Sequence, residues 1–164
     1  LSDLAKESVT NISAVVKKLT GKDIQDYDLH VQFPGTHNVD GDSASITMAT
    51  AIISAFEGVP IDQNLAMTGS LSVRGEVLPI GGVSAKIEAA VKSGIERVII
   101  PRSNLQDVLI DEKYESMVEV LPVDSLDEVL QHALVGAEEK VSLVERLANV
   151  IDTISSGPDT QPSA

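Results

Sequence analysis

The sequence predicts a mixed α/β (α+β) fold with a β-hairpin and flanking helices. Some segments repeat apolar residues at helical spacing, and others alternate apolar with polar residues. A hairpin between residues 65 and 80 interrupts the succession of helices and strands, so a regular doubly wound sheet is not expected. No internal repeat is visible, which argues against solenoids and propellers.

In the first third of the chain, a helix is expected over residues 3–19, and Gly21 follows it as a natural stop. Alternation over residues 27–33 predicts a strand that ends at Pro34-Gly35. A polar loop over residues 37–42 then leads into residues 43–56. Because that segment is apolar nearly all round, it predicts a helix buried on several sides.

The remaining elements follow from the same patterns. The predicted hairpin pairs residues 65–72 with residues 76–80, and Gly81-Gly82 separates it from a helix over residues 83–92. Further strands are expected over residues 97–100 and 118–123, and further helices over residues 103–109, 125–134 and 138–154.

At 164 residues the chain is long enough for one ordinary domain. We expect that domain over residues 1–154, with a helical entry segment at residues 1–21 and a C-terminal helix at residues 138–154. Residues 155–164 are small, polar and rich in proline, so a disordered tail is expected there.

Composition excludes several functions. The chain has no cysteine, which removes disulfides and thiolate chemistry, and its three histidines are too far apart for a close-spaced zinc motif. A formal charge of -13 and a pI near 4.4 disfavour nucleic acid as a partner. No apolar run approaches the roughly 20 residues that span a bilayer, so we expect this chain to be cytoplasmic.

The loop Asp40-Gly41-Asp42-Ser43 enters the buried helix and is the first candidate site. Unpaired backbone amides at a helix start can bind a developing oxyanion, and Ser43 would stand beside them as a nucleophile. The alternative is structural, because aspartate and serine before a helix are also ordinary N-caps.

Lys86, on the helix after Gly81-Gly82, is the second candidate. At roughly 100° per residue it lies about 40° beyond the apolar arc of that helix, so partial burial is expected. Burial lowers a lysine pKa, and a value of about 7 to 8 would allow the neutral amine to take the Ser43 proton. The alternative is a lysine that snorkels to solvent from a helix flank.

Three blocks, GDSAS, MTGSLSVRGEVLPIGGVSAKIEAA and GIERVIIP, resemble the peptidase domain of the Lon proteases over nearly all of residues 27–134. The separation of Ser43 and Lys86 also matches that family. The resemblance implies a compact module around a mixed sheet, with Ser43 as nucleophile and Lys86 as general base. It further implies that Thr68 orients the lysine, although a strand threonine bonded to a neighbour would look the same.

Two positions distinguish the branches of this family. Asp42 stands where bacterial members have proline, as it does in the archaeal, membrane-anchored branch, and Asp40 replaces a glutamate that is usual in that branch. Because an opposite charge favours the ammonium form, Asp42 could hold Lys86 charged and switch the base off. We take this resting lock as a hypothesis.

The resemblance also implies what lies outside the chain. No phosphate-binding loop of the GxxxxGK[ST] type occurs, so no cofactor is expected here, and ATP and Mg²⁺ would belong to an ATPase domain in the same parent chain. This chain would then be a fragment of a hexameric, ATP-dependent protease of quality control that degrades unfolded or damaged proteins. Any anchor to the cytoplasmic face of the cell membrane would lie in the missing part.

Two other functions fit parts of the pattern. A non-catalytic Lon-like docking domain attached to another ATPase would keep the fold without needing a paired serine and lysine. An amidase or esterase for small molecules is the second alternative, and the lack of a G-x-S-x-G elbow argues against its common form.

Overall fold

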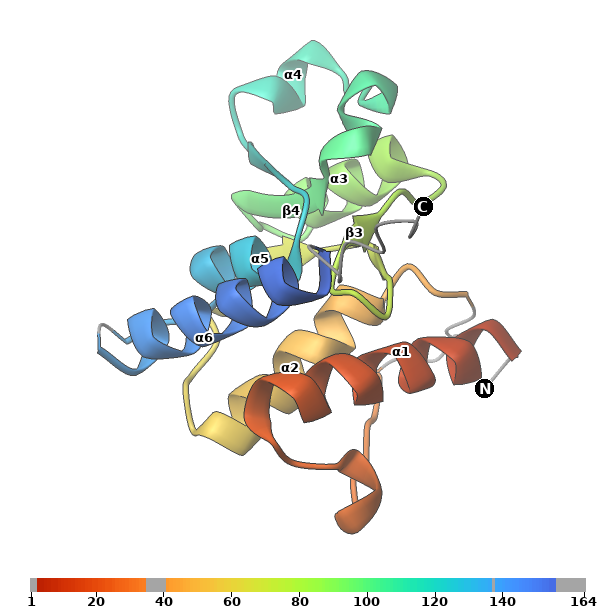
Figure 1. The fold of residues 1–164 in the computed structure, drawn as a ribbon. Helices are drawn as coiled ribbons and strands as arrows, with labels where there is room; N and C mark the ends of the chain where they lie inside the picture. The colour runs from red at the N-terminus through yellow and green to blue at the C-terminus, as the bar shows by residue number, and fades with distance from the viewer. Residues whose placement is uncertain (1–2, 35–40, 137, 156–164) are drawn as a thin grey trace, which may run out of the picture.

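The computed structural model describes residues 3–34, 41–136 and 138–155. Helices and short strands alternate along these residues (Figure 1). Their order is α1 (Asp3–Thr20), η1 (Ile24–Asp26), α2 (Ser45–Glu57), β1 (Leu65–Met67), β2 (Ser70–Leu71), β3 (Val77–Leu78), α3 (Val83–Lys92), β4 (Arg97–Pro101), η2 (Arg102–Asp107), α4 (Glu112–Glu115), β5 (Glu119–Val123), α5 (Leu126–Ala133) and α6 (Glu138–Ser155).

The strands form two sheets, one parallel and one antiparallel. β4 is the centre of a parallel sheet in the order β1-β4-β5, with Ala66 opposite Val98 and Val98 opposite Val120. β2 and β3 make a separate antiparallel hairpin. The predicted mixed α/β class is therefore confirmed.

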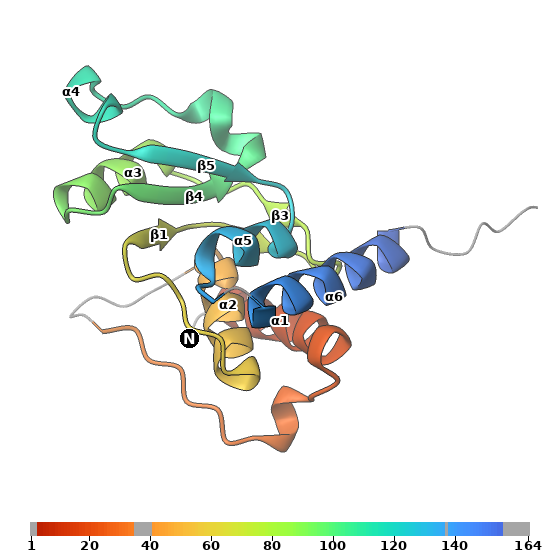
Figure 2. The same ribbon diagram turned by 90° about the vertical axis from the view of Figure 1, so that its left-hand side faces the viewer.

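The parallel sheet lies between two apolar clusters because residues of β4 point alternately to its two faces. Val98 and Ile100 pack on one face with Val83 and Ile87 of α3. Ile99 points to the other face and joins the main core, which α5 covers. Figures 1 and 2 show α3 and α5 on opposite sides of the sheet.

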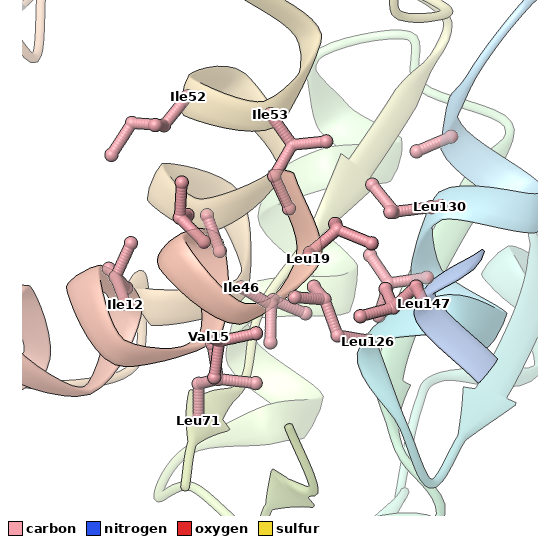
Figure 3. Close-up of a cluster of buried hydrophobic side chains, with 14 of the residues drawn as sticks. Ile12, Val15, Leu19, Ile46, Ile52, Ile53, Leu71, Leu126, Leu130 and Leu147 are labelled. Atoms are coloured by element: carbon pink, nitrogen blue, oxygen red, sulfur yellow. The ribbon is translucent and has the colours of Figure 1, made fainter. Parts of the chain in front are cut away.

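The main core is built by four helices together with the hairpin and one face of the sheet. Side chains of α1, α2, α5 and α6 meet there, as Figure 3 shows. The predicted core positions Ile12, Val16 and Leu19 of α1 are buried, whereas Val9 is 41% exposed. The helix α2 is buried on several sides, as its apolar sequence predicts.

Several predicted elements agree with the structure within one or two residues. They are the helices α1, α2, α3, α5 and α6 and the strands β4 and β5. The expected helix over residues 103–109 is the 3-10 helix η2, and the short helix α4 was not predicted.

The predicted strand over residues 27–33 is wrong. No strand pairs with it in the described part of the chain, and Tyr27, Val31 and Phe33 are exposed by 36% or more. Leu29 instead packs against the main core, and the segment borders an apolar groove beside α1 and α2. Alternation made residues 27–33 suitable for a strand, but a strand also needs a partner at hydrogen-bonding distance.

The predicted strand over residues 65–72 is interrupted at Thr68-Gly69. Thr68 donates its amide proton to the Ile99 carbonyl at 3.1 Å and so continues the edge of the parallel sheet. Gly69 then turns towards the loop before α2. Its amide donates to the Ser43 carbonyl at 2.8 Å, and its carbonyl accepts from the Ile46 amide at 3.2 Å. The break therefore attaches the Ser43 loop to the sheet.

Gly69 allows this close approach because it has no side chain. A Cβ at this position would lie 3.1 Å from both Ile46 Cδ1 and Val77 Cγ1, and both side chains are buried in the main core. We predict that Gly69→Ala lowers the free energy of unfolding by about 1 to 3 kcal/mol, as overpacked cores do. Urea denaturation of this variant and the parent chain would measure the loss.

Gly81→Ala is the matched control for Gly69→Ala. A Cβ at Gly81 would meet no atom within 4 Å. The midpoint of urea denaturation of Gly81→Ala should therefore stay close to that of the parent chain. Equal midpoints for Gly69→Ala and Gly81→Ala would contradict the close approach.

Candidate active site

Ser43 lies in a turn before α2, two residues ahead of Ser45, where the helix begins, although the predicted helix started at Ser43 itself. Its carbonyl accepts two hydrogen bonds, from the Gly69 amide at 2.8 Å and from the Thr68 hydroxyl at 3.1 Å. The Ser45 amide donates to the Asp42 carbonyl at 2.9 Å and closes the turn. The backbone on both sides of the Ser43 side chain is thus held.

The capping interpretation of this loop is wrong. The N-cap of α2 is Ala44, and it makes no side-chain capping bond. The side chains of Asp42 and Ser43 are therefore not used to cap the helix.

Lys86 is on α3, and α3 is anchored to the parallel sheet by Val83 and Ile87. Gly82 precedes the helix with φ +70°, in the left-handed region that favours glycine, and this bends the chain into α3. The Lys86 side chain is partly buried, as its place beside the apolar arc predicts.

The structure brings the two candidates into contact although they are 43 residues apart. Lys86 Nζ lies 2.7 Å from Ser43 Oγ and 3.2 Å from Thr68 Oγ1. Thr68 is only 6% exposed and also donates to the Ser43 carbonyl, so its hydroxyl touches both partners. The lysine therefore does not snorkel to solvent, and the Thr68 hydroxyl contacts both the Ser43 carbonyl and the Lys86 amine.

The electrostatics of Lys86 depend on two opposing effects. Partial burial lowers the pKa of the Lys86 amine below its usual range, because loss of water disfavours the ammonium form. The charge of Asp42 raises the same pKa, but it is the smaller of the two effects. Among the described residues no ion pair joins Asp42 and Lys86, and the amine contacts the two hydroxyls.

Backbone amides beside Ser43 are available for an anion. Within the described residues, no hydrogen bond uses the amide of Ser43 or Ala44. Both precede the N-terminus of α2, where the helix dipole favours negative charge. The loop therefore places donors next to the hydroxyl of Ser43.

Gly41 and Asp42 form the loop that leads to Ser43. Gly41 opens the described part of the loop with φ +94°, and Asp42 follows it. Asp40 lies outside the described residues, as does His37. No group of three or more histidine, aspartate or glutamate side chains in the described ranges could hold a metal ion.

The chain matches a known protein family over most of its length. The family model of the Lon protease (S16) C-terminal proteolytic domain matches residues 1–136. This chain belongs to that family. The family indicates a serine peptidase, which is the class that the Ser43 loop suggests.

Curated relatives of this Lon domain come from archaea and bacteria. It is 54% identical over 157 residues to an archaeal Lon protease of Methanothermobacter thermautotrophicus, covering 95% of this chain and 24% of the relative. It is 56% identical over 152 residues to an archaeal Lon protease of Halobacterium salinarum, covering 92% and 22%. A Lon protease of Azorhizobium caulinodans is 37% identical over 154 residues, covering 89% and 18%. The chain thus spans about a quarter of the length of these two archaeal relatives.

Sequence reasoning did not identify two residues that shape the site of this Lon domain. Gly69 holds the Ser43 loop, and Asn104 holds the residues that lead into α3. The only signal for Gly69 was a glycine inside a strand pattern, which often marks a close backbone approach. Asn104 gave no signal in the sequence, because its two hydrogen bonds with Ile80 join residues 24 positions apart.

Asp42 offers a direct test of the opposing effects on Lys86. Because its charge raises the pKa of Lys86, Asp42→Asn should lower that pKa further below the value in the parent Lon domain. The measurement is a ¹³C NMR titration of the Lys86 Cε signal, assigned by its loss in Lys86→Met. Asp26→Asn, a change of the same kind near α1, serves as control and should leave the pKa of Lys86 unchanged. A pKa that rises or stays constant in Asp42→Asn would contradict the effect of the carboxylate.

Proposed function

We propose that this domain is an endopeptidase in which Ser43 is the nucleophile and Lys86 the general base. The contact of 2.7 Å between Lys86 Nζ and Ser43 Oγ is the observation that supports it most directly. Nucleophile and base lie within hydrogen-bond reach, and burial shifts the base towards its neutral form.

In the proposed reaction, neutral Lys86 accepts the proton of the Ser43 hydroxyl as Ser43 Oγ attacks the scissile carbonyl. The amides of Ser43 and Ala44 are placed to stabilise the oxyanion of the tetrahedral intermediate. The Lys86 ammonium then protonates the leaving amine, and the C–N bond breaks to give an acyl-enzyme on Ser43. Water attacks this ester with Lys86 again as base, which releases the second product and restores the Ser43 hydroxyl.

Thr68 has a positioning role in this proposal. Its hydroxyl donates to the Ser43 carbonyl and accepts from Lys86, so one side chain fixes the distance between base and loop. Its burial removes competing water from that contact. The resting lock by Asp42 stays a prediction, since Lys86 is bonded to Ser43 in this structure.

We further propose that the domain works within a longer, ATP-dependent protease that degrades unfolded or damaged proteins. Support comes from the archaeal Lon relatives, of which this chain covers about a quarter. ATP and Mg²⁺ would bind to an ATPase domain elsewhere in the longer protein, because these 164 residues contain no phosphate-binding loop. A homohexameric ring, a cytoplasmic location and a membrane anchor of the parent protein are parts of the same proposal. No helix among the described residues is long and apolar enough to cross a bilayer.

Removing either member of the pair should abolish proteolysis. We predict that Ser43→Ala and Lys86→Met each reduce casein cleavage by at least about a thousandfold, as loss of a nucleophile or its base does. The assay follows release of labelled peptides by the parent chain and both variants.

Ser93→Ala and Lys92→Met are matched controls, since both residues are exposed at the end of α3. They should retain the activity of the parent. If Ser43→Ala and Lys86→Met also retain it, the pair is not the machinery, and a docking function becomes the better interpretation.

Thr68 can be tested with two variants of similar size. Thr68→Val keeps the volume but loses the hydroxyl, and it should lower kcat about tenfold to a hundredfold because the base is held less well. Thr68→Ser keeps the hydroxyl and should stay within about threefold of the parent kcat by the same reasoning. Steady-state kinetics on a fluorogenic peptide would measure both, and equal kcat values for the two variants would contradict the role.

A further inference from the structure

Asn104 is a buried polar residue far from Ser43 in sequence, and it makes three side-chain hydrogen bonds. Its side chain is 3% exposed and lies on η2, just after β4. Its Oδ1 accepts from the Ile80 amide at 2.9 Å, and its Nδ2 donates to the Ile80 carbonyl at 3.0 Å. The same Nδ2 donates to Asp107 Oδ2 at 2.9 Å. The two acceptors around Nδ2 and the donor at Oδ1 define the orientation of the amide.

Ile80 is the residue from which the chain enters the helix of the proposed base. It is followed by Gly81 and Gly82, and Gly82 stands directly before α3 in a left-handed conformation. These glycines have no side chains that could fix the connection by packing. The two bonds to Asn104 therefore hold the last residue before a segment of intrinsically free backbone.

A second contact fixes the first turn of α3 to the same part of η2. Ser84 Oγ donates to the Asp107 carbonyl at 2.9 Å and accepts from the Leu109 amide at 2.9 Å. Asp107 thus contacts Asn104 through its carboxylate and Ser84 through its carbonyl. Residues on both sides of Gly81-Gly82 are tied to one short segment.

We infer that Asn104 is a positioning residue for the Ser43–Lys86 pair, because it fixes the start of α3 and thereby the place from which Lys86 reaches Ser43. The inference builds on the proposed function. Lys86 follows Ile80 by six residues and is the fourth residue of α3, so a shift or rotation at the start of the helix moves its amine. Reaction rates are sensitive to such displacements, and about 1 Å can change a rate about a hundredfold.

Asn104→Ala removes all three bonds and is the first test. We expect kcat on a fluorogenic peptide to fall about tenfold to a hundredfold while KM stays within about twofold, since chemistry and not peptide binding is disturbed. We also expect the pKa of the Lys86 amine to rise towards the ordinary lysine value, because a displaced amine gains water. The ¹³C titration of Lys86 Cε reports this directly. Asp42, the charged group that acts on Lys86, is unchanged in these variants.

Asn11→Ala is the matched control. Asn11 Nδ2 donates to the Leu71 carbonyl at 3.1 Å and ties α1 to β2, so its loss also removes an amide contact but leaves α3 untouched. Its thermal stability should fall, whereas its kcat and its Lys86 titration should match those of the parent. All assays are carried out well below the melting temperature of the least stable variant.

A paired exchange tests rescue and serves if Asn104→Ala does not fold. Asn104→Asp keeps the acceptor for the Ile80 amide, but it loses the donor to the Ile80 carbonyl and places its carboxylate against Asp107. Adding Asp107→Asn restores a donor between these two side chains. We expect the double variant to recover kcat and the Lys86 pKa together relative to Asn104→Asp alone.

The outcomes separate this inference from the proposed function. If Lys86→Met keeps full activity, the proposed base is wrong, and the Lys86 titration alone then decides whether Asn104 positions the amine. If Lys86→Met is inactive but Asn104→Ala matches Asn11→Ala in kcat and in the Lys86 titration, the pair stands and the role of Asn104 is overturned. The role of Asn104 is also overturned if the pKa of Lys86 is the same in Asn104→Asp and in the double variant.

Discussion

The site depends on the attachment of the Ser43 loop to the Thr68-Gly69 segment. Backbone bonds from Gly69 to Ser43 and Ile46 join the start of α2 to the edge of the parallel sheet. The same sheet carries α3 on its other face through the cluster of Val98 and Ile100. The proposed nucleophile and base therefore come from two layers, and these layers are connected at the edge of β1.

This arrangement gives the contact between Lys86 and Ser43 its precision. The backbone that carries each side chain is restrained for a different reason. The Ser43 loop is hydrogen-bonded on both sides of the serine. The helix of Lys86 packs on the parallel sheet, and Asn104 binds Ile80 just before that helix begins. Thr68 lies between them and contacts both. A hydrogen bond of 2.7 Å between groups from separate elements is maintained only when the supporting backbone is held as well.

The sequence predicted what local patterns can determine. Helical spacing identified α1, α2, α3, α5 and α6, and the resemblance of three blocks to Lon proteases pointed to Ser43, Thr68 and Lys86 before their contact was known. The sequence could not predict that residues 27–33 find no strand partner among the residues that the structure describes, because pairing depends on what lies beside a segment in space. For the same reason Asn104 was missed, since a polar residue after a strand looks like any surface residue until its burial is known.

Asp42, beside the proposed base Lys86, acts against the effect of burial on the Lys86 amine. Burial alone would make the Lys86 ammonium costly at any pH, and one pKa unit corresponds to about 1.4 kcal/mol of difference between the two protonation states. Asp42 offsets part of that cost when Lys86 carries a proton, and in the proposed reaction Lys86 carries one between proton transfer from Ser43 and release of the leaving amine. In the proposed reaction, the carboxylate would therefore stabilise the charged form of Lys86 after proton transfer, while burial favours its neutral form before it. Because the two effects act on the same ammonium with opposite sign, their balance sets the pH range in which the proposed base could both take and return a proton.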